Sequence, residues 1–432
     1  GDFDDPARWI GGVIPGAGTD AAIDFTDQPQ VIHASGSDTV HSLRNIAGDF
    51  VMTGGTLSAV AVENDSAMSW SGGALVLNTG SGGIASFLNP TGATLNIVPD
   101  GQRLSVTGSG TATMTNAAAI VVGGGNGAAD LDAPLANTGE LTITSGTLSL
   151  NGGGSSSGYG IAAGAGAVLQ FGTTASGGSN TFTITDGFLA PANTALTGGT
   201  LDASAASAIV FIDSLRVAAG SLLLGAGSAT DQGTLAQSGG TIAGSGTLAV
   251  VGGGFLAGGV QTGGLTTALS GISGIGNGFA LDGGATVQNN QWLNWSAGDI
   301  ALGSGDAAAI SQTGTLTNDY ILYVTADDRI AGSGAVNNAA GAVMAVYAGS
   351  GETDIDVALN NAGHLQVQSG TLSLNGGGSS SGDGIFTAPG AVLQFGSAMA
   401  GAGGTFAIDG GFFAPTDTTL NGGTLDVSAA GA

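Results

Sequence analysis

Two short acidic motifs stand at equivalent places in the sequence, and each offers a pair of carboxylates that suits a metal ion. The motifs read Asp-Leu-Asp and Asp-Ile-Asp. On a β-strand the two carboxylates of such a motif point outward and the apolar residue between them points inward. Carbonyl oxygens from neighbouring chain segments would complete the six to eight oxygen ligands that Ca²⁺ takes. The interpretation that stays open beside calcium is an ordinary solvated surface, and no other cofactor is expected. The four candidate ligands are Asp130, Asp132, Asp354 and Asp356.

A second acidic group, Asp327-Asp328-Arg329, has the residue types that polysaccharide-cleaving β-helix enzymes use. Glycoside hydrolysis needs two carboxylates about 5–10 Å apart, and adjacent residues on a strand would point to opposite faces. Asp100 and Arg103 lie at a similar place earlier in the chain, which indicates a local ion pair. The histidines match no metal-binding spacing such as HxH or HExxH. We therefore expect no enzymatic activity.

Aromatic residues form a third set with possible chemistry, because exposed rings can stack on sugars. The alternative interpretation is packing in the core, where aromatic residues are more common. Trp70 and Trp295 recur at matching places in the two halves of the chain, which favours the core for these two. The set comprises Trp9, Trp70, Trp292, Trp295, Tyr320, Tyr323 and Tyr347.

Charge and cysteine content exclude several classes of function. The chain has 432 residues with 31 acidic and 5 basic side chains, a net charge of −26. Nucleic acids and anionic lipids bind clustered Lys and Arg, so neither is an expected partner. The chain has no cysteine, so it forms no disulfide and no thiolate site. The uncharged stretch 232–281 is interrupted by glycines, and a membrane-spanning helix needs about 20 apolar residues; we expect no membrane span.

A long internal duplication dominates the organisation of the chain. Residues 145–206 and 369–430 align without a gap, and about two thirds of the aligned positions are identical. The relation extends upstream, where residues 64–73 match residues 289–298. The sequence thus predicts a cap or docking region at 1–53, a first repeat block at 54–208, intervening coils at 209–288 and a second block at 289–432. The second block duplicates about 64–208.

Within each block, short runs of alternating apolar and polar residues follow glycine-rich turns. Glycine accounts for 84 residues and charged residues for only 8%, which disfavours helices. In Glu140–Ile143, for example, the period of two places Leu141 and Ile143 on one face. Two or three such strands make one coil of a β-solenoid, with glycines at corners that need positive φ. The residues expected to point inward are Leu148, Leu150, Val168, Leu169 or Phe171, and their counterparts Leu372, Leu374, Val392, Leu393 or Phe395.

These blocks resemble the secreted bacterial β-strand-repeat proteins, broadly like filamentous-haemagglutinin-type adhesins. The similar pieces are Trp-Ser-Gly-Gly at 70–73, the N-x-G-x-L-x-V-like units at 137–143 and 361–367, the adjoining SGTLSLNGGG, and AVLQFG at 167–172 and 391–396. The stretch Trp9–Ile23 resembles the start of such repeat domains. The resemblance implies an all-β fold, namely a right-handed parallel β-helix, and an exported surface or matrix protein without catalytic residues.

The sequence leads to the hypothesis of a structural extracellular protein of a bacterial surface. Its expected role is that of an adhesin stalk, a biofilm matrix component or a filament subunit. The expected partners are further copies of the chain stacked end to end, or neighbouring repeats of a longer chain, and surface glycans. The alternative is a β-helix protein that binds or cleaves polysaccharide. A polysaccharide-binding assay and a reducing-sugar assay separate these classes.

Overall fold

The computed structural model describes residues 1–25, 30–157, 160–173, 180–190, 193–303, 315–382, 384–396, 404–410 and 417–430. These residues form a parallel β-solenoid of about 17 turns, with 60% of the chain in strands. The only helical segment among them is a single 3₁₀ turn, η1 (Pro6–Arg8). The all-β prediction with short strands is therefore confirmed.

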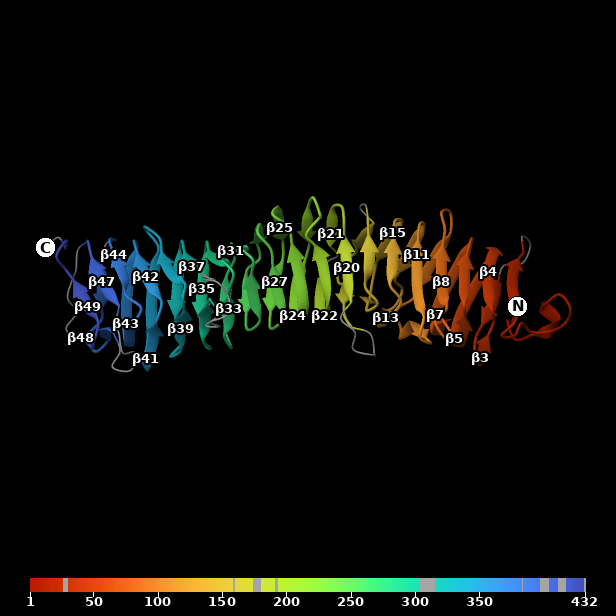
Figure 1. Ribbon diagram of the computed structural model, residues 1–432, viewed down its shortest axis with the longest axis horizontal. Helices are drawn as coiled ribbons and strands as arrows, with labels where there is room; N and C mark the ends of the chain where they lie inside the picture. Colours follow the sequence, from red (N-terminus) through yellow and green to blue (C-terminus); the bar gives the residue numbers. More distant parts are fainter. Residues whose placement is uncertain are drawn as a thin grey trace. The chain divides into compact units, whose positions relative to one another are not determined.

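The chain divides into two compact units, and each consists of strands stacked coil upon coil (Figure 1). The first unit contains residues 1–214 and 220–223, and the second contains 215–219 and 224–432. One long strand, β24 (Ser214–Leu224), contributes residues to both units. The predicted boundaries after residues 53, 208 and 288 stay predictions.

In the first unit the described strands are β1 (Asp20–Asp24), β2 (Gln30–His33), β3 (Ser37–Thr39), β4 (Ser42–Ala47), β5 (Asp49–Ala59), β6 (Ala61–Asn64), β7 (Ala67–Asn78), β8 (Ile84–Asn89), β9 (Thr94–Ile97), β10 (Gln102–Thr107), β11 (Thr111–Asn116), β12 (Ala119–Val122), β13 (Ala128–Leu131), β14 (Leu135–Asn137), β15 (Glu140–Ile143), β16 (Thr147–Leu150), β17 (Gly154–Ser156), β18 (Ile161–Ala163), β19 (Val168–Phe171), β20 (Thr181–Ile184), β21 (Phe188–Ala190), β22 (Asn193–Ala203) and β23 (Ile209–Phe211).

In the second unit the described strands are β25 (Ser228–Asp231), β26 (Thr234–Gln237), β27 (Thr241–Ala243), β28 (Thr247–Val250), β29 (Gly254–Leu256), β30 (Val260–Thr262), β31 (Thr266–Leu269), β32 (Ser273–Ile275), β33 (Phe279–Leu281), β34 (Thr286–Asn289), β35 (Trp292–Trp295), β36 (Ile300–Leu302), β37 (Thr315–Asn318), β38 (Ile321–Val324), β39 (Arg329–Gly332), β40 (Ala335–Asn338), β41 (Val343–Ile355), β42 (Ala358–Asn361), β43 (His364–Leu374), β44 (Gly378–Ser380), β45 (Ile385–Thr387), β46 (Val392–Phe395), β47 (Thr405–Ile408), β48 (Thr418–Leu420) and β49 (Thr424–Asp426).

Each coil contributes strands to three faces, which we call the ladder face, the middle face and the acidic face. The ladder face carries the buried asparagines and the acidic face carries the Asp-x-Asp motifs, both described below. In the first unit the ladder face includes β4, β6, β8, β11, β14 and β17; the middle face includes β9, β12, β15 and β18; and the acidic face includes β10, β13, β16 and β19. In the second unit the ladder face includes β34, β37, β40, β42 and β44. Its middle face includes β35, β38 and β45 with the first parts of β41 and β43. Its acidic face includes β36, β39 and β46 with the last parts of β41 and β43.

The interior of each unit is a set of apolar columns, because parallel pairing repeats the same register from coil to coil. Leu104 pairs with Leu131 and Leu131 with Leu150, and all three are at most 2% exposed. Stacking of this kind buries each apolar side chain between the coils before and after it.

The predicted inward residues are confirmed, and the structure resolves the alternatives among them. Leu148, Leu169 and Phe171 are at most 1% exposed, whereas Val168 lies on the outer side. The second repeat block shows the same burial pattern. Its buried residues are Leu372, Leu374, Leu393 and Phe395, and Val392 lies on the outer side.

Glycine corners set the start of the duplicated strands. In the Ser-Gly-Thr-Leu turns, Gly146 and Gly370 have φ of 72° and 75°, a region that favours glycine. A Cβ at Gly146 would lie 2.4 Å from Pro99 Cγ, and one at Gly370 would lie 2.7 Å from the Gly351 carbonyl oxygen. The corners therefore accept no larger residue without a shift of the backbone.

Parallel pairing is present within the residues predicted to form a cap or docking region. Strand β1 pairs with β4, and β2 and β3 both pair with β5. Residues 1–3 lie against β2, where the Phe3 amide donates a hydrogen bond of 2.7 Å to the Ile32 carbonyl and the Ile32 amide donates one of 2.7 Å to the Gly1 carbonyl. The described strands from β1 to β5 are thus already part of the solenoid coils.

Candidate functional site

The first predicted acidic motif lies on the acidic face of the first unit, where an arginine from the preceding coil engages it. Arg103 Nη2 lies 2.6 Å from Asp132 Oδ2, and Asn151 Nδ2 donates a hydrogen bond of 3.1 Å to Asp132 Oδ1. The side chain of Asp132 is only 8% exposed. Asp130 pairs in register with Arg103 on the neighbouring strand, and Leu131 points inward as expected. The arrangement is a partly buried ion pair supported by an amide.

The second unit repeats this cluster with equivalent residues. Arg329 forms an ion pair with Asp356, whose side chain is 14% exposed. Asn375 Nδ2 donates to Asp356 Oδ1 at 2.7 Å and to Asp354 Oδ1 at 3.0 Å. Burial raises the pKa of Asp354 above its usual value, and the charges of Glu352 and Asp356 act in the same direction. Each motif therefore has one carboxylate that an arginine neutralises.

The side chains of the candidate catalytic group Asp327-Asp328-Arg329 have different partners in the structure. Asp327 and Asp328 lie in the turn before β39, not on a strand as expected. Asp328 Oδ2 accepts a hydrogen bond of 2.6 Å from the Gly298 backbone amide, and Arg329 turns to Asp356. In the earlier block Arg103 likewise pairs with Asp132 and not with Asp100. These side chains stabilise turns between coils.

Calcium binding at the two motifs stays a prediction. In the part of the chain that the structure describes, no three His, Asp or Glu side chains form a group that could hold a metal ion. Calcium would therefore have to draw on main-chain carbonyl oxygens and compete with Arg103 and Arg329 for a carboxylate.

Chelation tests the calcium prediction directly. If calcium binds at the motifs, EDTA lowers the melting temperature, because a ligand bound only by the native state stabilises it. The double variant Asp130→Asn/Asp354→Asn, which leaves both ion pairs in place, should then melt at the same temperature with and without EDTA. A wild-type melting curve that EDTA does not change would contradict calcium binding.

The aromatic set separates into core and surface members. Trp70 and Trp295 are at most 1% exposed, and their indole nitrogens donate to the carbonyl oxygens of Gly73 at 3.2 Å and Gly298 at 2.8 Å. Their assignment to the core is confirmed. Trp292, Tyr320 and Tyr347 are 43–49% exposed, and this exposure leaves them available to a ligand.

A buried ladder of asparagines runs through the first unit, and the sequence analysis did not identify it. Asn45, Asn64, Asn89, Asn116 and Asn137 lie at or near the C-terminal ends of strands of the ladder face and are at most 2% exposed. Each side-chain amide donates to the side-chain oxygen of the next asparagine at 2.7–2.9 Å, and the last one donates to a serine hydroxyl. Most also donate to a backbone carbonyl of the following coil. The ladder holds successive coils in register.

The second unit contains an equivalent ladder of Asn289, Asn318, Asn338 and Asn361, which ends at Ser380. Its donor–acceptor distances are 2.7, 2.8, 2.7 and 2.9 Å. A sequence signal for both ladders exists, since an asparagine recurs after alternating residues and before a turn. The intervals between ladder residues range from 19 to 29 residues, so a fixed period does not reveal it.

Asp231 occupies the same column of the second unit but lacks the pairing of the ladder. It pairs in register with Val250, followed by Leu269 and then Asn289. Asp231 is 0% exposed, and one carboxylate oxygen has no hydrogen-bond partner among the described residues. Burial raises its pKa to about 6, against the opposing effect of backbone amides of Gly233 and Leu215.

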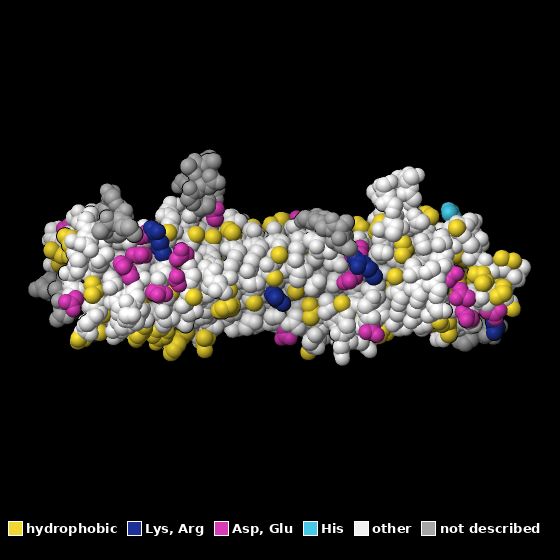
Figure 2. Space-filling model, turned by 90° about the horizontal axis from the view of Figure 1, so that it is seen from below, with side chains coloured by type: hydrophobic (Ala, Val, Ile, Leu, Met, Phe, Trp, Pro, Cys, Tyr) yellow, Lys and Arg dark blue, Asp and Glu magenta, His cyan; other side chains and the backbone are white. Residues whose placement is uncertain are grey.

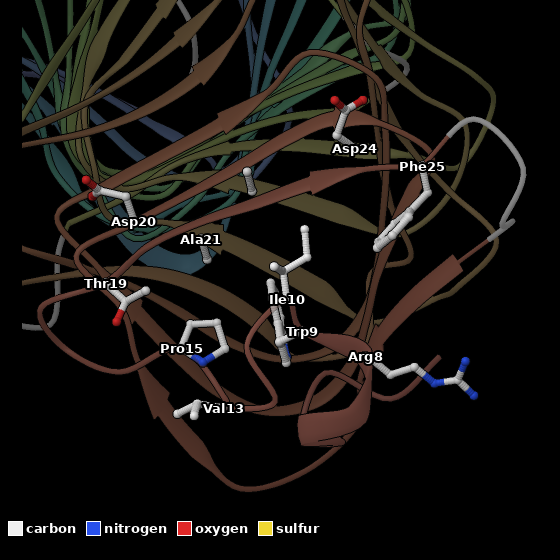
Figure 3. Close-up of a pocket in the computed structure, with 11 residues that line it drawn as sticks. Arg8, Trp9, Ile10, Val13, Pro15, Thr19, Asp20, Ala21, Asp24 and Phe25 are labelled. Carbon is white, nitrogen blue, oxygen red and sulfur yellow. The ribbon is translucent and has the colours of Figure 1, made fainter.

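A cavity of about 340 Å³ lies beside β1 at the N-terminal end of the first unit (Figure 3). Figure 3 shows the ring of Phe25 directed toward Ile10, while the guanidinium of Arg8 points away. Ile10 and Val13 are 107% and 72% exposed, and Trp9 is anchored by a 2.7 Å hydrogen bond from its indole nitrogen to the Phe3 carbonyl. The cavity is a mainly apolar surface next to the first strand of the solenoid.

Comparisons of the chain with protein-family models, curated proteins and solved structures found no match. Within the described ranges, no helix has the length and the apolar character needed to cross a membrane. The parallel β-solenoid is consistent with β-helix repeat proteins in general. Assignment to haemagglutinin-type surface proteins therefore rests on the sequence resemblance alone.

Proposed function

We propose that the chain is a non-enzymatic structural protein of a bacterial exterior, acting as a stalk, a matrix component or a filament subunit. The observation that carries this proposal is the construction of each unit. Parallel coils are joined by backbone hydrogen bonds and apolar columns that repeat from coil to coil, and by a buried amide ladder in part of each unit. Such a unit is stabilised by nearest-neighbour contacts between coils, which suits a load-bearing spacer.

Self-association end to end is the assembly that the exposed apolar residues support. Ile10 and Val13 beside β1 offer one surface, and Leu420 on β48 and Val427 directly after β49 are 56% and 48% exposed. Edge strands present unpaired N–H and C=O groups that pair with another chain. A contact between two different surfaces of identical chains does not close and grows into a filament.

Sedimentation velocity and electron microscopy at increasing protein concentration test the assembly. We expect end-to-end species, and we expect the Ile10→Ser/Val13→Ser variant to associate at least about tenfold more weakly, a loss of about 1.4 kcal/mol. Ile84→Ser is the matched control, because Ile84 is 76% exposed on a lateral strand. Purely monomeric particles at high concentration would contradict the proposal of self-association.

A reducing-sugar assay separates the structural proposal from the enzymatic alternative. We expect no turnover of pectic or neutral polysaccharides above that of a heat-denatured sample. Turnover that Asp328→Asn or Asp356→Asn abolishes would instead establish a polysaccharide-cleaving enzyme. Antibodies against the chain should also label intact cells of its source if the protein lies on the cell surface.

A further inference from the structure

Three aromatic side chains from consecutive coils form a line on the middle face of the second unit. Trp292 on β35 and Tyr323 on β38 have ring centroids 5.5 Å apart, and Tyr323 and Tyr347 on β41 have centroids 6.0 Å apart. Trp292 and Tyr347 are 44% and 43% exposed. We call Trp292, Tyr323 and Tyr347 the aromatic strip. The strip crosses the strands diagonally, because Trp292 is in register with Ile321 and Tyr323 with Ala345, so each step to the next coil also moves two residues along the strand.

The outward column that contains Tyr323 extends the strip. In register across the sheet, Asn294 pairs with Tyr323, followed by Ala345, Gln366 and Phe386. Phe386 is 53% exposed, so a further ring projects from the same face two coils on. Figure 2 shows hydrophobic side chains gathered near the lower edge of the view on the second unit. The side-chain amides of Asn294 and Gln366 add hydrogen-bonding groups to this column; their oxygens accept hydrogen bonds from Thr325 and Gln368.

The first block provides an internal comparison, since its middle face has the same register. Trp292, Tyr323, Tyr347 and Phe386 correspond there to small or polar residues. The inward residues are instead conserved in character between the blocks: Trp295 corresponds to Trp70, and Leu322 corresponds to Leu95. The fold therefore does not need the outward rings. The four counterparts in the first block are Ala67, Asn96, Gly123 and Ala162.

The charge distribution indicates what the strip can bind. The outward positions at and between the rings hold no Asp, Glu or Arg, although the chain has a net charge of −26. An anionic ligand would be repelled by the whole protein, and a cationic one would find no carboxylate in the strip. A neutral ligand with apolar faces and hydroxyl groups fits both the rings and the amides.

We propose that the aromatic strip binds an extended, neutral polysaccharide, a function beyond the structural role. Aromatic rings stack on the C–H faces of pyranose units, and the amides of Asn294 and Gln366 can hydrogen-bond to their hydroxyl groups. The ring centroids along the strip are 5.5 and 6.0 Å apart, a spacing close to the length of one pyranose unit in an extended chain. A linear glycan can therefore lie along the strip and meet rings from consecutive coils.

Affinity electrophoresis of the full chain tests the proposal. The protein is run in native gels that contain hydroxyethyl cellulose, xylan, galactomannan or dextran. We expect retardation by at least one of these polymers, and at least a tenfold loss of affinity in Trp292→Ala/Tyr323→Asn/Tyr347→Ala. Two of these substitutions introduce residues that the first block carries in the same register, so the variant is expected to fold. Circular dichroism and the melting temperature check this expectation.

Controls make each outcome decisive. Ile84→Ala removes an exposed apolar residue outside the strip and should leave the retardation unchanged. The single variants Trp292→Ala and Tyr347→Ala keep the test valid if the triple variant does not fold. Equal retardation of wild type and a folded strip variant would overturn the proposal, as would no retardation in any of the four polymers. A strip variant that loses only self-association in sedimentation would show instead that the strip is an interface between copies.

Discussion

Replacing Asn338 by alanine is expected to destabilise the second unit by about 3–5 kcal/mol. Asn338 is 1% exposed, accepts a hydrogen bond from Asn318 at 2.8 Å and donates to Asn361 at 2.7 Å and to the His364 carbonyl at 3.1 Å. The substitution leaves a buried donor on one neighbour and a buried acceptor on the other. Each unsatisfied buried polar group costs about 1–3 kcal/mol.

Urea denaturation followed by circular dichroism measures this effect, and the sequence provides a matched control. The adjacent Asn337 lies on the outer side of the same strand, where it accepts a hydrogen bond of 2.9 Å from the exposed Asn360. Asn337→Ala should change the free energy of unfolding by less than about 0.5 kcal/mol. Equal effects of the two substitutions would show that the ladder does not stabilise the coils. Hydrogen exchange should show the loss of protection centred on β37, β40 and β42, because coils interact mainly with their neighbours.

Replacing Asp231 by asparagine is expected to stabilise the protein, by about 2–3 kcal/mol at pH 7.5 and by almost nothing near pH 4. Burial raises the pKa of Asp231 from 3.8 to about 6. The folded protein therefore binds this proton more tightly than the unfolded chain does. Between about pH 4 and pH 6 the contribution of Asp231 to stability falls as pH rises, and above pH 6 the full penalty of the buried charge applies. A shift of one pKa unit corresponds to about 1.4 kcal/mol.

The comparison must be made at equal pH, because many other carboxylates also titrate on acidification. Melting curves of wild type and Asp231→Asn at pH 4, 5, 6 and 7.5 give the difference directly. Asp327→Asn, at an exposed position in a turn of the same unit, removes one charge without this burial and is the charge-matched control. A stability difference between wild type and Asp231→Asn that is independent of pH would contradict the assigned protonation of Asp231.

The location of Asp231 explains why one carboxylate can affect the unit so strongly. Its column contains Val250 and Leu269 before the ladder begins at Asn289. An asparagine at 231 keeps the size of the side chain and removes the charge. Its partner in the next coil is Val250, which has no side-chain amide to pair with it. The expected gain is therefore the relief of desolvation and not an extension of the ladder.

Local sequence was sufficient to predict the fold class and much of the core. Alternation in Thr147–Leu150 and Val168–Phe171 identified short strands, and the glycine turns before them identified corners that need positive φ. These features depend only on steric preferences and on the period of two along a strand, which act between residues close in sequence. The duplication then extended each prediction to the second block, where Leu372 and Leu393 are buried like Leu148 and Leu169.

The sites, in contrast, were decided by the register between coils. Arg103 forms its ion pair with Asp132, which is 29 residues away in the sequence. The sequence analysis had instead predicted an ion pair between Arg103 and the nearer Asp100. The ladder asparagines recur at unequal intervals of 19 to 29 residues because the turns differ in length from coil to coil. The sequence analysis named Trp292, Tyr323 and Tyr347 as aromatic candidates, but it did not predict that their rings lie next to one another. Parallel hydrogen bonding brings these side chains into columns whatever the length of the intervening turn, and that information exists only in the tertiary structure.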